Sequence, residues 1–135
     1  MFLHAKNMVG GYGETTILNN CSINVNEGEI AVIVGPNGAG KSTAMKAIFG
    51  MLNLRQGNIY FNGEDITSLS PQDRVKKGMG FVPQTNNVFT SMTVLENLEI
   101  GSFTNLDRMK NNIDEIFNLF PILGEKQKQI VGELS

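Results

Sequence analysis

Hydrophobic and polar positions divide the chain into a β-rich beginning and a more helical second half. Short apolar or alternating stretches predict strands over residues 2–8, 17–25 and 29–34, separated by turns at residues 10–13 and 26–28. The third stretch is almost continuously apolar, which is typical of a strand that is buried on both faces of a parallel sheet. This pattern favours an α/β fold.

The middle of the chain alternates between helix and strand signals. Apolar residues recur at helical spacing over residues 41–52, directly after a glycine-rich turn. Residues 58–62 predict another strand, and residues 79–82 predict a short apolar one. Between these two strands, Ser70 is expected to cap a helix that ends at Gly78.

The second half of the chain carries mainly helix signals. Thr93 and Glu96 form a capping-box pattern, which predicts a helix through about Gly101. Another helix is expected over residues 107–120, where Pro121 stops it. Its large apolar side chains share one face, and we interpret this stripe as core packing rather than as a ligand site.

The composition excludes several kinds of site. The 135 residues carry a formal charge of −2, so we expect no nucleic acid partner, because nucleic-acid-binding domains usually have a basic excess. Cys21 is the only cysteine and His4 the only histidine, which excludes an intrachain disulfide and argues against a histidine-based catalytic triad. No apolar run approaches the roughly 20 residues that cross a bilayer, and no signal peptide pattern occurs. We therefore expect a cytoplasmic protein without direct lipid insertion.

One motif carries specific chemistry. It follows the pattern G-x-x-x-x-G-K-[ST] and consists of Gly35, Pro36, Asn37, Gly38, Ala39, Gly40, Lys41 and Ser42, with Thr43 next. Its glycines allow successive backbone N–H groups to face an anion, and the helix that follows presents the positive end of its dipole. Lys41 is expected to reach the β- and γ-phosphates, and the Ser42 hydroxyl to ligate Mg²⁺. The loop therefore predicts binding of the phosphates of a nucleotide.

The motif alone does not distinguish the families of proteins that bind phosphate in this way. A GTPase is expected to read its base with Asn-Lys-x-Asp, and that motif does not occur in the sequence. A nucleotide kinase usually has an arginine-rich lid, whereas this chain has only Arg55, Arg74 and Arg108.

Residues on either side of the loop resemble the ATP-binding-cassette family. Tyr12 lies 29 residues before Lys41 and resembles the aromatic residue that stacks on adenine in that family. Gln84 lies 43 residues after Lys41 and matches the glutamine that contacts Mg²⁺ and the attacking water. Leu134 and Ser135 fall where the family's Leu-Ser-Gly-Gly-Gln signature begins. The resemblance covers the whole chain and implies ATP and Mg²⁺ as cofactors.

The resemblance also implies a P-loop NTPase fold of the ATP-binding-cassette type. Residues 1–84 would form its β-rich and phosphate-loop part, and residues 85–135 its helical subdomain. The sequence lacks the family's acidic pair after four apolar residues and its downstream histidine, so the later core strands would be missing. We expect the N-terminal part of a longer ATPase, which alone binds ATP but does not hydrolyse it.

Three stretches, residues 38–50, 78–84 and 88–98, resemble the smaller ATPase subunit of branched-chain amino acid importers. Urea and amide importers share much of this pattern. The resemblance implies an ATPase on the inner face of the inner membrane, with permease subunits and a second ATPase subunit as partners. Residues 85–103 would form the docking surface for the permease.

Two alternatives to a transport ATPase remain open. A soluble ATP-binding-cassette protein acting in DNA repair or translation is expected to carry insertions or basic tracts, and neither is visible in the sequence. A nucleotide-binding module without turnover differs from an active enzyme in releasing no phosphate from bound ATP.

Overall fold

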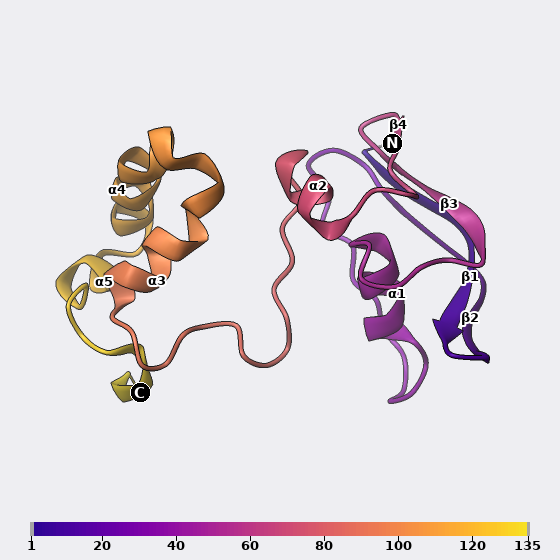
Figure 1. The fold of residues 1–135 in the computed structure, drawn as a ribbon, viewed down its shortest axis with the longest axis horizontal. Helices are drawn as coiled ribbons and strands as arrows, with labels where there is room; N and C mark the ends of the chain where they lie inside the picture. The colour runs from indigo at the N-terminus through magenta and orange to yellow at the C-terminus, as the bar shows by residue number, and fades with distance from the viewer. Residues whose placement is uncertain (1, 135) are drawn as a thin grey trace. The chain divides into compact units, whose positions relative to one another are not determined.

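The chain forms two compact units in a computed structural model that describes residues 2–134. The first unit comprises Met1–Phe81 and the second Val82–Ser135. The first contains a small sheet with two helices, and the second is helical (Figure 1). No helix of the described residues is long and apolar enough to cross a membrane.

The sheet of the first unit is antiparallel, and its strands lie in the order β2-β1-β3-β4. The strands are β1 (Leu3–Tyr12), β2 (Thr15–Val25), β3 (Gln56–Phe61) and β4 (Glu64–Asp65). A tight turn at Gly13 and Glu14 joins β1 to β2 and pairs Tyr12 with Thr15. Gly13 has a φ of 54°, a conformation that glycine adopts at little cost.

Helix α1 (Lys41–Ile48) packs on this sheet through one apolar face. The core combines one or two residues from each of β1, β2 and β3 with residues of α1 at a spacing of three or four. Its buried members are Ala5, Met8, Leu18, Ala44, Ala47, Ile48, Leu52, Ile59 and Ile66. Because this core fixes α1 against β1 and β2, it also fixes the loop from which α1 begins.

Helix α2 (Pro71–Lys76) begins as its sequence predicts. The hydroxyl of Ser70 accepts a hydrogen bond from the backbone N–H of Asp73 at 3.2 Å, and Pro71 occupies the first turn. Ser70 therefore satisfies one of the N–H groups that a helix start leaves unpaired.

The second unit contains helices α3, α4 and α5 together with two 3₁₀ turns. Their bounds are Val94–Gly101 for α3, Phe103–Arg108 for η1, Met109–Leu119 for α4, Pro121–Glu125 for α5 and Val131–Glu133 for η2. The predicted capping box is confirmed, because Thr93 and Glu96 exchange side-chain-to-backbone hydrogen bonds of 3.2 and 2.8 Å. The helix predicted over residues 107–120 is split between η1 and α4, and Pro121 then opens α5.

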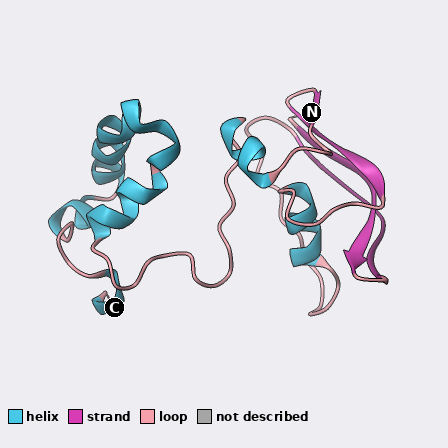
Figure 2. Ribbon diagram, in the orientation of Figure 1, coloured by secondary structure: helices cyan, strands magenta, loops and turns pink. Residues whose placement is uncertain are grey.

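Two predicted strands are wrong. Residues 29–34 and 79–82 form no strand, and Figure 2 shows both segments as loop. A strand needs a neighbour to pair its backbone groups, and the four-stranded sheet of the described residues includes neither segment. The apolar side chains of the first segment are consequently exposed, at 93% for Ile30 and 84% for Val34.

Smaller boundary differences have local causes. Strand β1 continues through the predicted turn at residues 10–13 as far as Tyr12, because its partner β2 begins at Thr15. Helix α1 ends at Ile48 rather than at residue 52, because Gly50 adopts a left-handed φ of 82° just beyond the C-cap.

Candidate functional site

The loop of residues 35–40 turns the chain into helix α1. Gly38 and Gly40 have φ values of 85° and 86°, which other residues rarely adopt. Gly40 is the N-cap of α1, and a Cβ there would lie 3.1 Å from Cγ2 of Ile17 on β2. The close approach of strand and loop thus favours glycine at this position for a second, independent reason, because a Cβ would push against the Ile17 side chain.

The N-terminus of α1 is open to an anion. Among the described residues, no side chain caps it, and its first turn carries no acidic residue. The first N–H groups of a helix have no partner inside the helix, and the helix dipole adds a partial positive charge there. The amides that follow Gly40 therefore fit a phosphate group, as the sequence motif predicts.

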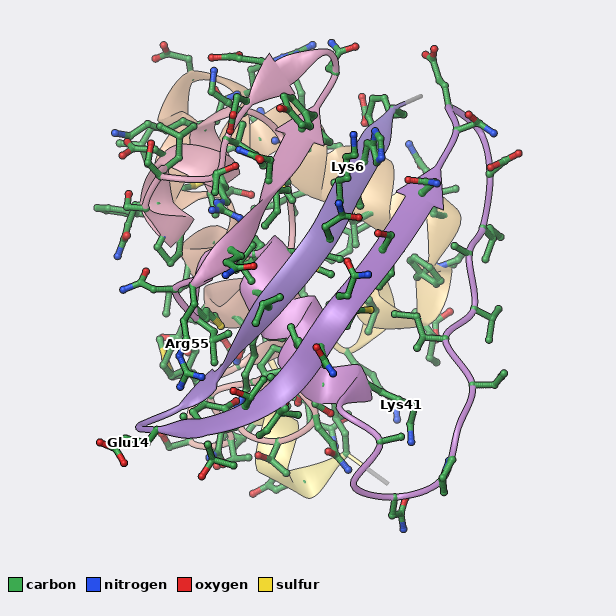
Figure 3. All side chains as sticks on the ribbon, turned by 90° about the vertical axis from the view of Figure 1, so that its right-hand side faces the viewer. Lys6, Glu14, Lys41 and Arg55 are labelled. Atoms are coloured by element: carbon green, nitrogen blue, oxygen red, sulfur yellow. The ribbon has the colours of Figure 1, made fainter. Side chains whose placement is uncertain are left out.

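Lys41 bridges the loop from the first position of α1. Its ammonium donates hydrogen bonds of 2.7 Å to the carbonyl oxygens of Gly35 and Pro36. Neither ion pair formed among residues 2–134 involves Lys41, so no carboxylate neutralises its charge in this part of the chain. Figure 3 labels Lys41 beside the loop that precedes α1. The lysine holds the loop in shape and keeps a free positive charge beside it.

The two hydroxyl residues after Lys41 have different surroundings. Ser42 is exposed, so its hydroxyl can act as a ligand for Mg²⁺. Thr43 is only 7% exposed and lies next to the core residue Ala44. No group of three or more acidic, histidine or cysteine side chains that could hold a metal ion occurs within residues 2–134.

Tyr12 lies at the end of β1, in the same unit as the phosphate loop, and is 48% exposed. The ammonium of Lys46 on α1 lies 5.9 Å from the centre of its ring. Lys46 follows Lys41 by five residues, which places its backbone about 7.5 Å further along α1 from the start of the helix. Arg55 braces the adjoining hairpin turn by donating to the Thr16 hydroxyl at 2.7 Å and to the Gly13 carbonyl. The exposed ring is therefore held near the helix that starts at the loop.

Gln84 belongs to the second unit, where it is exposed in the segment before α3. The structure thus groups Tyr12 with the phosphate loop in one unit and assigns Gln84 to the other. Leu134 is described, and Ser135 lies outside the described residues.

Sequence reasoning missed Lys46 and Arg55, which lie near Tyr12, and Arg74, which binds the far end of α1. Arg74 is 2% exposed, and burial lowers the pKa of its guanidinium. Arginine still remains charged at neutral pH. No local pattern marks these three residues, because each of them contacts groups that are distant in sequence or on another element.

Known proteins resemble the chain over most of its length. A family model described as ABC transporter matches residues 18–135. The chain is 40% identical over 134 residues to the probable branched-chain amino acid transport ATP-binding protein LivF of Archaeoglobus fulgidus, covering 98% of this chain and 57% of that protein. It is 41% identical over 120 residues to the phosphonates import ATP-binding protein PhnC of Fusobacterium nucleatum, covering 87% of this chain and 47% of that protein. The chain spans about half the length of these relatives.

A solved structure supports the same assignment. The crystal structure of a nucleotide-free ATP-binding cassette from an ABC transporter superposes with a TM-score of 0.85 at 33% identity, covering 99% of this chain and 59% of that one. The predicted α/β fold of the P-loop NTPase type is thereby confirmed. The match of the family model over residues 18–135 shows that the chain belongs to the ABC transporter family.

Proposed function

We propose that the loop of residues 35–43 binds the triphosphate of ATP and that Tyr12 stacks on the base. The observation that carries this proposal is the uncapped start of α1 beside Lys41, whose charge no carboxylate neutralises within residues 2–134. The backbone amides would bind phosphate oxygens, and Lys41 would exchange its carbonyl partners for the β- and γ-phosphates. Mg²⁺, held in part by Ser42, would supply charge neutralisation at the phosphates.

The exposure of Tyr12 supports a role in base stacking. Its side chain is 48% exposed at the end of β1, in the same unit as the phosphate loop. Lys46 lies over the ring and links it to the helix that bears the phosphate loop. Base–aromatic stacking contributes about 1–3 kcal/mol and depends little on the identity of the base.

The whole protein would be the ATPase subunit of a membrane transporter. Residues 1–84 would provide the ATP-binding part and residues 85–135 the helical part, and Gln84 would position water and Mg²⁺. Partners would be permease subunits, docked on residues 85–103, and a second ATPase subunit. Within residues 85–103, the exposed Val88 and Phe89 could supply apolar contacts to a permease on the inner face of the membrane.

The proposed transported solute is a branched-chain amino acid. Support comes from the A. fulgidus relative, whose match covers nearly all of this chain. The phosphonate import relative is equally similar over a shorter stretch, so phosphonate is the competing solute. Uptake of labelled leucine, phosphonate and urea by vesicles that contain the complete transporter would decide between them. Uptake of phosphonate or urea without uptake of leucine would refute this choice.

Calorimetric titration tests the nucleotide site directly. The chain is titrated with Mg-ATP, inorganic triphosphate and AMP, and triphosphate should retain most of the binding because the loop contacts phosphates. Lys41→Met should weaken Mg-ATP and triphosphate binding alike. Lys6→Met is the matched control, since Lys6 is an exposed lysine of the same unit on strand β1, away from the loop (Figure 3). Equal losses for both variants would refute a specific role for the loop.

A further inference from the structure

Arg74 is a buried cation that binds only backbone carbonyls. Its side chain is among the largest of the fully buried ones. The guanidinium donates to the carbonyl oxygens of Ala47 and Ile48, at 3.2 and 2.5 Å, and to those of Thr67 and Leu69, at 2.9 and 3.1 Å. Neither ion pair within residues 2–134 includes Arg74. The guanidinium therefore joins two backbone segments, the end of α1 and residues 67–69, to helix α2.

Two of these acceptors belong to the last turn of α1. The final carbonyls of a helix have no partner inside it, and a cation near them also interacts favourably with the helix dipole. Arg74 thus satisfies the C-terminus of the helix whose N-terminus carries the phosphate loop. Lysine cannot replace this arrangement, because its ammonium lacks the planar fork of five donors.

The same residue also holds the segment that leads to Gln84. The backbone carbonyl of Arg74 accepts a hydrogen bond of 3.1 Å from the N–H of Met79. Two residues later, the ring of Phe81 stacks on Phe49, the C-cap of α1, with 5.2 Å between ring centres and 26° between ring planes. The end of α1 is therefore joined to residues 79–81 by two independent contacts, and Gln84 follows three residues later.

We propose that Arg74 is a positioning residue that couples the occupancy of the phosphate loop to the segment before Gln84. The inference rests on the proposed ATP site. A ligand at one end of a short, packed helix shifts the helix as a unit, and the groups bound to its other end move with it. Arg74 and the stack of Phe81 on Phe49 transfer this shift to residues 79–81. Nucleotide binding then changes the conformational equilibrium of residues 79–81, and the conformation of these residues changes the affinity for nucleotide by the same factor.

Hydrogen–deuterium exchange of the full chain measures this coupling. Exchange is followed in peptides covering residues 35–44 and 77–82, with and without saturating Mg-ATP. All variants carry Gln84→Ala, so that direct contact of Gln84 with the nucleotide cannot produce the signal. In the chain that carries Gln84→Ala alone, which is the parent of the other variants, Mg-ATP should slow exchange in both peptides. Protection of residues 35–44 without any protection of residues 77–82 in this parent would refute the coupling.

Three variants separate the coupling from the binding. Arg74→Lys keeps the charge without the fork, and Phe81→Leu removes the stack on Phe49. Each should retain protection of residues 35–44, while the ATP-dependent protection of residues 77–82 falls about fivefold or more. Lys76→Met changes an exposed residue of the same helix and should leave both effects intact.

The outcomes of this experiment are distinguishable. Undiminished protection of residues 77–82 in Phe81→Leu and in folded Arg74→Lys would refute the role of Arg74. If Arg74→Lys does not fold, judged by its thermal unfolding, undiminished protection of residues 77–82 in Phe81→Leu refutes the transfer of a shift from the end of α1 to residues 79–81, on which the role of Arg74 depends. Absence of ATP-dependent protection at residues 35–44 in the parent would instead refute the proposed ATP site, and the coupling that rests on it.

Discussion

Replacing Lys41 by methionine separates its two roles, which are to shape the loop and to bind phosphate. Methionine keeps most of the length of the side chain and removes the charge. In the free protein, the variant loses two hydrogen bonds of 2.7 Å, to the carbonyls of Gly35 and Pro36. Both bonds lie at an exposed site, so water replaces them, and we expect unfolding free energy to change by less than about 1 kcal/mol.

The effect on binding is larger because phosphate carries a negative charge. A hydrogen bond to a charged group contributes about 1.5–3 kcal/mol, and each 1.4 kcal/mol is a factor of about ten in affinity. Lys41 must release its two carbonyl partners before it contacts phosphate, which lowers the net gain. We therefore expect the lower part of this range, a loss of about tenfold to thirtyfold in affinity for Mg-ATP.

Calorimetry on Lys41→Met, Lys6→Met and the unchanged chain measures this difference. Thermal unfolding of each variant establishes that the first unit remains folded. If Lys41→Met binds Mg-ATP within about twofold of the unchanged chain, Lys41 does not contact phosphate. So small a loss is less than the expected one even after the release of the two carbonyl partners is taken into account. An equal loss in Lys6→Met would show that only the net charge of the unit matters.

Further predictions concern Tyr12, Gln84, Arg74 and Glu96. Tyr12→Ala should weaken ATP and GTP alike by roughly tenfold in calorimetry and leave triphosphate binding unchanged; an equal loss for triphosphate would make Tyr12 structural. In the complete transporter, Gln84→Ala should bind ATP normally and show less permease-stimulated hydrolysis, and full stimulation would exclude it from coupling. Arg74→Met removes four hydrogen bonds to buried or partly buried carbonyls, so urea unfolding of the first unit should show a loss of at least about 2 kcal/mol. Hydrogen bonds from the backbone and hydroxyl of Thr93 hold the pKa of Glu96 below its ordinary 4.5. The ionised carboxylate therefore stabilises α3 above pH 4.5, and this stabilisation is lost as the pH falls through the lowered pKa. Between about pH 6 and 3, the helix content should fall in the unchanged chain for this reason, and Glu96→Gln should lack this contribution.

Local chemistry made part of the fold predictable. Ser70 and Thr93 cap helices by contacting N–H groups three residues away, so the sequence alone contains both partners. The glycines of the phosphate loop are equally local, since their left-handed φ values belong to single residues. The composition of the loop therefore predicted the turn and the start of α1.

Pairing between distant segments was not predictable in this way. The apolar run of residues 29–34 indicates a capacity for burial, but a strand also needs a partner, which is a property of the fold. Arg74 contacts the end of α1 from 26 and 27 residues away, and no periodic pattern marks such a contact. Its role emerges only from its burial and its four carbonyl acceptors.

The open stretch before the phosphate loop has a consequence for the behaviour of these 135 residues in solution. Ile30, Val32 and Val34 are 93%, 77% and 84% exposed, and their backbone groups enter none of the strand ladders of residues 2–134. An extended apolar segment with unpaired backbone groups can pair with the same segment of a second copy. The residues that lead into the phosphate loop should therefore drive self-association as the concentration of this chain rises.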